Sequence, residues 1–260
     1  MKDMIKFTPL FSGSKGNCSL VRSDSVNILL DIGYSYKSIV ARLAEEGLAP
    51  KDIDAIVITH EHSDHVSALP MWTKKCSTTV YAPQAIADLI CQRAYCSTVV
   101  EVSGKFDVKG VTVTPYECSH DVVSCFGYKF TDGDGSFASI TDTGCESQCT
   151  VDFLKDCKTI QIECNHDVDM LKKGPYSFPL KRRILSDYGH LSNAQTAGIL
   201  QKLIGSEVKN VVLAHLSEQN NTKELAFAQV VSMYTANDVT EGKDVTVYVV
   251  DQYKNDITIV

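Results

Sequence analysis

The sequence predicts an α+β fold, a four-layer αββα sandwich built as one domain over residues 1–260. Segments with strand and helix character alternate in the first and last thirds of the chain, and a β-rich segment separates them. Each half can therefore place helices on one face of a mixed sheet, which leaves the other two faces to pack against each other. No linker, low-complexity tract or internal repeat interrupts this order.

In the first third, short apolar runs separated by turn residues predict strands. Residues 35–46 instead carry apolar side chains at helical spacing, and Gly47 ends this helix. A short helix is expected after Val66, and Pro83 is expected in the first turn of a helix that runs toward Cys91. The strands are expected at residues 4–11, 19–22, 26–30 and 53–58, and one more ends at Tyr81.

The rest of the chain continues the same pattern. Gly133-Asp134-Gly135 is typical of a hairpin turn between the last two strands of the β-rich segment. A helix is predicted at residues 193–203. The strands are expected at residues 99–102, 111–116, 125–130 and 136–141, and then at 159–163, 210–214 and 245–249.

Composition and charge argue against several classes of protein. With 44% hydrophobic and 22% charged residues, the chain has the composition of an ordinary globular protein. No apolar run approaches the roughly 18 residues that span a bilayer, so we expect a soluble, cytoplasmic protein with no membrane partner. A formal charge of −7 argues against a nucleic-acid coat protein, but not against an enzyme that meets nucleic acid in a cleft. The ten cysteines form no Cys-x-x-Cys pair, and we expect reduced thiols.

The run Thr59-His60-Glu61-His62-Ser63-Asp64-His65 directly follows a predicted buried strand. Imidazoles and carboxylates are the ligands that borderline divalent metals prefer, and this run is dense in both. Side chains two residues apart in an extended segment point the same way, so His60 and His62 can bind one metal. Where the chain then turns, Asp64 and His65 can reach a second metal.

Three more candidate ligands, His120, Asp142 and His215, each stand where a predicted strand has just ended. Side chains at the carboxyl ends of strands are held by a rigid sheet and still reach the open rim where substrates bind. A lone His or Asp in such a place is more often a capping or turn residue. Together with the cluster, however, the three complete a site for two metals.

Asp31, the cluster and these three residues follow one another in an order that resembles the five-motif pattern of the metallo-β-lactamase superfamily. The resemblance covers nearly the whole chain and implies this superfamily's αββα fold. It also implies that Asp31 steadies the ligand loop, although a carboxylate ending a strand at a turn is an equally good interpretation of Asp31. The implied ligands are His60, His62 and His120 for metal one, Asp64, His65 and His215 for metal two, and Asp142 as the bridge.

Single residues favour one branch of this superfamily. His65 stands where zinc β-lactamases usually have Arg, and His62 stands where flavodiiron enzymes have Glu. Phosphodiesterases of the superfamily have one more histidine before the last ligand, and His190 matches it. His190 precedes a capping box formed by Ser192 and Gln195, and a helix N-terminus favours anionic oxygens. Basic residues precede it, either as a phosphate-binding patch or as a solvated helix face: Lys172, Lys173, Lys181, Arg182 and Arg183.

Three short segments, at residues 11–19, 165–167 and 189–193, look like the WalJ/YycJ/VicX family, which is associated with DNA exonuclease activity. PhnP-type cyclic phosphodiesterases and tRNase Z are similar but more distant. Lys15 departs from the small residue that family members often have. His166 is expected to be a structural or pocket-wall residue. The candidate substrate contacts are Ser12, Asn17, Lys181, Arg182, Arg183 and Asn193.

The expected reaction is hydrolysis of a phosphodiester in nucleic acid by a hydroxide that bridges two divalent metal ions. Zinc, manganese and iron all suit such ligands. Asp64 is expected to orient the nucleophile or accept its proton, and His190 to act as general acid or to stabilise charge. The alternatives are a small cyclic phosphodiester as substrate, or a lactone or thioester, since the metals do not choose the substrate.

Overall fold

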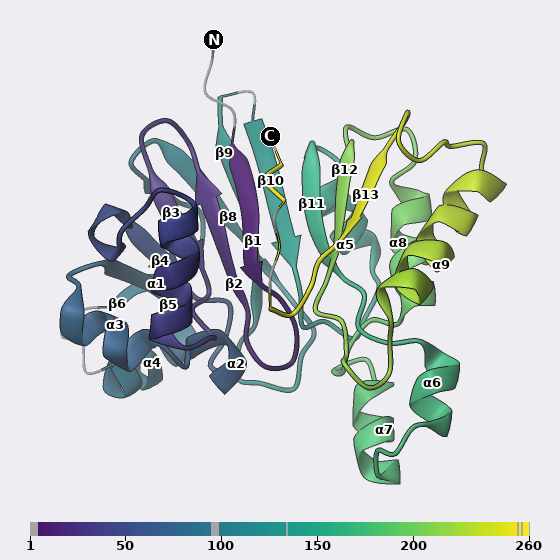
Figure 1. Cartoon of the computed structure of the whole chain (residues 1–260), viewed down its shortest axis with the longest axis horizontal. Coiled ribbons are helices and arrows are strands. Elements are labelled where there is room, and N and C mark those ends of the chain that lie inside the picture. The colour runs from purple at the N-terminus through teal and green to yellow at the C-terminus, as the bar shows by residue number, and fades with distance from the viewer. Residues whose placement is uncertain (1–4, 95–98, 134, 254, 256, 260) are drawn as a thin grey trace.

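Two mixed β-sheets pack face to face between two layers of helices, which confirms the predicted αββα sandwich (Figure 1). The computed structural model describes residues 5–94, 99–133, 135–253, 255 and 257–259. Three sequence predictions lie outside these residues: the start of the first strand at Met4, the turn residue Asp134, and the thiol of Cys96. No helix in the described part of the chain is both long and apolar enough to cross a membrane.

The first sheet contains six strands in the order in which they occur along the chain. Its first three strands pair antiparallel and the others pair parallel. Helices α1 (Tyr36–Glu45), α3 (Leu69–Lys75) and α4 (Ala87–Ala94) cover its outer face, and α2 (Ser63–Val66) lies near its edge (Figure 1). The strands are β1 (Lys6–Phe11), β2 (Cys18–Arg22), β3 (Asn27–Leu30), β4 (Ala55–Val57), β5 (Thr79–Pro83) and β6 (Val99–Val102).

The second sheet contains seven strands in the order β13-β12-β11-β10-β9-β8-β7. Helices α5 (Gln148–Leu154), α8 (Asn193–Lys202) and α9 (Lys223–Ala236) cover its outer face. Helices α6 (Val168–Lys173) and α7 (Phe178–Ile184) project beyond the sandwich at one edge (Figure 1). The strands are β7 (Phe106–Val108), β8 (Val111–Glu117), β9 (Phe126–Asp132), β10 (Gly135–Ile140), β11 (Thr159–Glu163), β12 (Asn210–Ala214) and β13 (Thr246–Val249).

Alternation of side chains along each strand divides the apolar core into three layers. In β3, Leu29 packs with the first helix layer, whereas Ile28 and Leu30 face the other sheet. In β12, Val212 and Ala214 enter the same central core. Because both faces of these strands are buried, shifting either strand by one residue would exchange its side chains between two packed layers and disrupt both of them.

One local prediction was wrong. Pro83 does not lie in the first turn of a helix: it ends β5, is extended, and pairs with Val102, and α4 begins only at Ala87 after a short 3-10 turn. The helix expected after Val66 is α3, but a separate turn, α2, already forms inside the histidine cluster at Ser63. Helices α5, α6 and α7 and strand β7 were not located from the sequence, because such short elements show little periodicity. Helix α9 was not located either, because the apolar side chains of its 14 residues are not confined to one face.

The cysteines named at the end of this paragraph have free thiols, which agrees with the expected reduced state. Several are buried within apolar layers, where a thiol packs as a small hydrophobic group. Burial raises the pKa of the Cys164 thiol to about 12, so this thiol is unreactive at neutral pH. The free thiols are those of Cys18, Cys76, Cys118, Cys125, Cys145, Cys149, Cys157 and Cys164.

Candidate metal centre

Three of the predicted site residues share an unusual backbone conformation. Asp31, Asp142 and His215 each stand just beyond a strand, and their φ angles are 59°, 56° and 57°. A residue other than glycine costs roughly 1–3 kcal/mol in this left-handed region, and such strain persists only where the surroundings impose it. The three strand ends therefore turn their side chains toward one edge of the sandwich at a cost in stability.

The histidine cluster turns at α2, and the loop after β3 holds that turn in place. The backbone N–H of Ile32 donates to the carbonyl of His65 at 2.8 Å. At Gly33 the two loops are so close that a Cβ atom would lie 1.6 Å from the carbonyl oxygen of Asp64. Only glycine fits at this position, so the approach of the loops is encoded by one residue.

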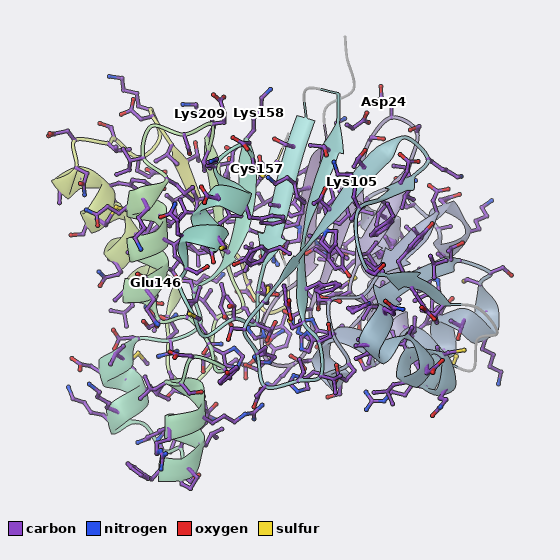
Figure 2. All side chains as sticks on the ribbon, turned by 180° about the vertical axis from the view of Figure 1, so that it is seen from behind. Asp24, Lys105, Glu146, Cys157, Lys158 and Lys209 are labelled. Carbon is purple, nitrogen blue, oxygen red and sulfur yellow. The ribbon has the colours of Figure 1, made fainter. Side chains whose placement is uncertain are left out.

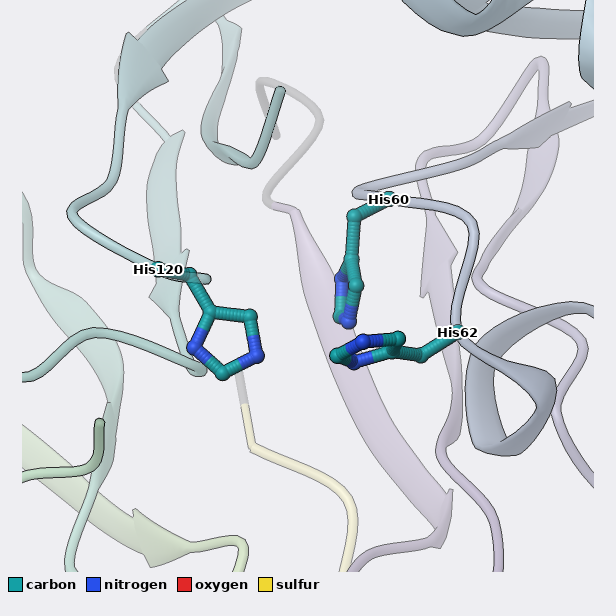
Figure 3. Close-up of side chains that lie close together, drawn as sticks. All are labelled: His60, His62 and His120. Carbon is teal, nitrogen blue, oxygen red and sulfur yellow. The ribbon is translucent and has the colours of Figure 1, made fainter. Parts of the chain in front are cut away.

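His60, His62 and His120 form the first ligand group, and Figure 3 shows their rings turned toward one point. The ring centroids lie 4.8 Å apart for His60 and His62, 5.3 Å for His60 and His120, and 5.2 Å for His62 and His120. One ligand atom from each ring lies within 4.8 Å of the others, which is the spacing around a single metal ion.

Asp64, His65 and His215 form the second ligand group, and their ligand atoms likewise lie within 4.8 Å of one another. Asp142 lies between the groups. Its Oδ2 is 3.3 Å from Nε2 of His65, and its Oδ1 is 3.6 Å from Nε2 of His215 and 3.9 Å from Nε2 of His120. One carboxylate thus faces both groups.

The inward-facing atoms of this cluster fit metal ions. Four of them are buried and have no hydrogen-bond partner among the described residues: Nε2 of His60, His120 and His215, and Oδ2 of Asp142. Leaving one buried polar atom unsatisfied costs about 1–3 kcal/mol, so four at a single point need a ligand that is not a protein group. Divalent cations match this set of imidazoles and carboxylates.

Buried groups behind the ligands orient their rings. Nδ1 of His65 lies 2.7 Å from Oδ2 of Asp31, and Thr59 donates to the same carboxylate from its hydroxyl and its backbone N–H. Nδ1 of His215 lies 2.8 Å from Oε1 of Glu163. An Nδ1–H held by a carboxylate leaves Nε2 unprotonated and directed at the metal position.

Sequence reasoning missed Glu163, although its side chain is fully buried at the site. Its Oε1 lies 2.7 Å from Nδ1 of His190 as well as 2.8 Å from Nδ1 of His215. Its Oε2 accepts from the backbone N–H groups of Thr143 and Leu191. The signal that could have revealed it is a carboxylate at the carboxyl end of a predicted strand, as at Asp31.

Glu163, His190, Asp142 and His215 are also close enough to form a metal site by themselves. The hydrogen bonds disfavour this grouping. Both oxygens of Glu163 already accept bonds, and the Nδ1 atoms of His190 and His215 are the nitrogen atoms that it holds. Glu163 is therefore placed to hold two histidines rather than a metal.

The carboxylates of the site give it a negative charge that neutral imidazoles leave uncompensated. Burial lowers the pKa of His215, but Asp142 and other carboxylates outweigh burial and raise it to about 10. Burial also lowers the pKa of His65, and Asp31 and Asp142 nevertheless hold it well above its usual value. Divalent cations would neutralise these carboxylates and leave the imidazoles neutral, which is the form that binds metal.

A cavity of about 290 Å³ opens onto the ligands. His190 and Arg183 form part of its wall, so the structure brings these two predicted residues to the site. The guanidinium of Arg183 forms an ion pair with Asp121, next to His120. The other lining residues are Ser14, His62, Ser63, Asp64, His120, Asp142 and His215.

Other candidate substrate contacts have internal partners, and the prediction needs correcting for them. Ser12 is buried, and its hydroxyl accepts from the backbone N–H of His215. Asn17 is buried with its Nδ2 3.0 Å from Nε2 of His65. Asn193 is buried in a network with Asn221 and Cys164. These side chains hold the site loops together and do not face the cavity.

The basic run divides into three environments. Lys181 donates to the carbonyls of Lys172 and Gly174 at 2.7 Å, so it joins α7 to α6 instead of facing a ligand. Arg182 is exposed on α7, and Arg183 faces the cavity. His166, predicted to be structural or part of the wall, is fully buried, and burial lowers its pKa to about 4.

The fold and the ligand arrangement define a class of protein. The family model of the metallo-beta-lactamase superfamily matches residues 12–215, and the chain belongs to this superfamily. Within it, the chain is 36% identical over 250 residues to "Exodeoxyribonuclease WalJ" of Streptococcus pneumoniae, covering 94% of this chain and 93% of that protein. It is also 36% identical over 230 residues to "Exodeoxyribonuclease YycJ" of Bacillus anthracis, covering 85% and 86%. The chain is therefore a member of the WalJ/YycJ family.

Solved structures of low sequence identity confirm the fold. The metallo-beta-lactamase fold protein YhfI from Bacillus subtilis superposes with a TM-score of 0.76 at 14% identity, covering 98% of this chain and 99% of that one. Human tRNase Z, short form, superposes with a TM-score of 0.64 at 16% identity, covering 98% of both chains. At these identities the likeness concerns the arrangement of strands and helices alone.

Proposed function

We propose that this chain is a metal-dependent nuclease that hydrolyses phosphodiester bonds in DNA, acting as an exonuclease. The observation that carries the proposal is the cavity wall, in which His190 and Arg183 stand beside the convergent metal ligands. A cationic side chain and an imidazole at this place match an anionic phosphoryl group. The names of the two exodeoxyribonuclease relatives support the same substrate.

Two divalent ions would fit the ligand groups: the first group would hold one and the second group the other, and Asp142, which faces both groups, could contribute to both. Zinc, manganese and iron all suit this mixture of imidazole and carboxylate. When bound, such ions provide Lewis acidity and lower the pKa of a water molecule, which hydrolysis at neutral pH requires.

The protein's own side chains complete the reaction. The side chain of Asp64 is 23% exposed whereas that of Asp142 is 3% exposed, so Asp64 is the carboxylate that an attacking water can reach and that would orient it or accept its proton. Burial lowers the pKa of His190, but Glu163 at 2.7 Å outweighs burial and raises it. The raised pKa favours the protonated form of His190, which can donate a proton to the leaving oxygen, and Arg183 supplies positive charge beside the phosphoryl group.

The test uses metal-loaded protein with end-labelled single- and double-stranded DNA and RNA, bis(p-nitrophenyl) phosphate, and a panel of acyl esters. Replacing the general acid in His190→Ala should lower kcat on DNA by roughly 10²- to 10⁴-fold while bound metal is unchanged. The exposed, distant Lys158→Ala should behave as the unmodified protein. Loss of metal from His190→Ala would make His190 a ligand, and hydrolysis of acyl esters alone would replace the nuclease by an acyl hydrolase.

Two broader proposals accompany this function. The chain works as a single domain, because the central core draws side chains from both sheets. It acts in the cytoplasm, where its free thiols stay reduced. Unfolding in one transition by calorimetry would agree with the first, and two separate transitions would contradict it.

A further inference from the structure

Two hollows adjoin the metal-ligand cavity, and each shares one wall residue with it. His120 lines the cavity and also a hollow of about 390 Å³ whose wall includes Tyr188. Arg183 lines the cavity and also a hollow of about 380 Å³ whose wall includes Phe178 and Arg182. A substrate longer than a single phosphodiester would therefore extend from the ligands over α7 and the loops beside it.

Large apolar side chains are exposed along these hollows. Phe178 is 74% exposed, Tyr188 is 63% exposed, and Val123, which lines the same hollow as Tyr188, is 72% exposed. In α7 itself only Ile184 is buried. Exposing rings to water forfeits the free energy that packing them would provide, so a group of exposed rings beside a catalytic cavity indicates a binding surface.

Positive charge accompanies the rings. Arg182 is exposed beside Phe178, and no hydrogen bond or ion pair to it is found in the described part of the chain. Lys173, at the end of the neighbouring α6, is also exposed. In a protein of net charge −7, cations on the one projecting pair of helices produce a local charge opposite to that of a phosphate backbone.

We propose that Tyr188 and Phe178 bind unpaired nucleotides at the end of a DNA strand, each ring stacking on a base, with Arg182 against the backbone phosphates. This inference rests on the proposed nuclease function. It adds that the nucleotides next to the scissile bond must be unpaired. A paired base is covered by its neighbours within the duplex, whereas an unpaired base offers its face to an aromatic ring. Stacking is indifferent to base identity, so little sequence preference is expected.

The test compares Tyr188→Ala and Phe178→Ala with the unmodified metal-loaded enzyme on end-labelled single-stranded DNA. Each loss of stacking should raise KM by about five-fold or more and leave kcat within about two-fold. Tyr188→Phe keeps the ring and should restore the original KM. DNA with abasic residues next to the scissile bond should raise KM for the unmodified enzyme, but add nothing further when Tyr188→Ala and Phe178→Ala are combined, because both stacking contacts are already absent.

Matched controls lie outside the residues that line the two hollows. Phe227→Ala removes a ring that is 36% exposed on α9, and it should leave KM unchanged. Lys209 lies at the end of the sandwich away from α6 and α7 (Figure 2). Arg182→Ala should lower the slope of log KM against log salt by about 0.7 per lost phosphate contact, and Lys209→Ala should not.

Each outcome decides a different question. If the unmodified enzyme cleaves DNA and Tyr188→Ala and Phe178→Ala bind it as well as Phe227→Ala does, the inference is wrong and the nuclease function stands. If the unmodified protein is a dimer and these two variants are monomers with unchanged KM, the rings serve self-association instead. If the unmodified enzyme cleaves bis(p-nitrophenyl) phosphate but no DNA, the proposed function fails. Anisotropy of labelled single-stranded DNA with the same variants then decides whether the surface binds it.

Discussion

The two ligand groups differ in what holds their histidines in place. In the second group, His65 and His215 each direct Nδ1 at a buried carboxylate, Asp31 at 2.7 Å and Glu163 at 2.8 Å. In the first group the partners are neutral: Thr59 Oγ1 is 2.9 Å from Nδ1 of His60, and a backbone carbonyl accepts from His120. Within the described residues, no hydrogen bond to the ring of His62 is found.

This difference is one of charge. A carboxylate behind an imidazole makes its Nε2 a stronger ligand, whereas a hydroxyl or carbonyl only orients it. The second group therefore gathers more negative charge and should hold its metal more tightly than the first. Stepwise titration with a competing chelator should find two affinities. Equal affinities would show that the charge behind the histidines does not distinguish the two groups.

Asp142→Ala should have the largest effect, because this carboxylate faces both groups. Both metals should bind more weakly, by more than the roughly 10- to 100-fold typical of residues behind the ligands, and turnover should fall with them. Metal content by mass spectrometry, beside kcat, measures this. Asp152→Ala, an exposed carboxylate on α5, is the matched control. Retention of both metals would show that Asp142 does not bridge them.

Glu163→Gln should come next, since it places an amide N–H₂ where the carboxylate accepts from His190 and His215. We expect roughly 10- to 100-fold weaker binding at the second group and a further fall in kcat, because His190 loses the group that raises its pKa. The first group should keep its metal. An equal loss at both groups would contradict the assignment of Glu163 to one side of the site.

Asp31→Asn should have a smaller effect, because Asp31 contacts one ligand histidine and Glu163 contacts two. About ten-fold weaker binding at the second group is expected, with kcat little changed once metal is saturating. Burial raises the pKa of Asp31, so removing its charge should not lower the thermal stability of the metal-free protein. A lower melting temperature without metal would show that Asp31 mainly supports the loop.

Thr59→Val should have the smallest effect and should act on the first group. It removes the hydroxyl that lies 2.9 Å from Nδ1 of His60 and leaves that buried N–H without an acceptor. A loss of about 1 kcal/mol, or roughly five-fold in metal affinity, is expected at this group. An effect confined to the second group would mean that the hydroxyl serves chiefly Asp31.

How far the sequence could predict the site depends on how its residues are spaced. The His60–His65 cluster is dense and local, so its metal chemistry could be proposed before the fold was known. Glu163 is a single carboxylate at the end of β11, and its role depends on two histidines 27 and 52 residues away. No local sequence pattern indicates contacts between residues so far apart in the chain.

The basic run shows the same limit within one helix. Neighbouring residues on a helix point about 100° apart, so Lys181, Arg182 and Arg183 could not all face one phosphate. Lys181 bonds to the end of α6, Arg183 pairs with Asp121, and only Arg182 remains fully exposed without such a partner among the described residues. The sequence identified the charge, and the helix determined its direction.

Taken by itself, the sequence determined the layered fold, the candidate ligands and their order, because strand alternation and a dense cluster of metal-binding side chains are local properties. The tertiary structure alone decided which carboxylate stands behind which imidazole, and which polar side chains face the cavity rather than a neighbouring loop. The physical reason is that these contacts join strand ends that are distant along the chain, and only the packing of two sheets brings those ends to one edge.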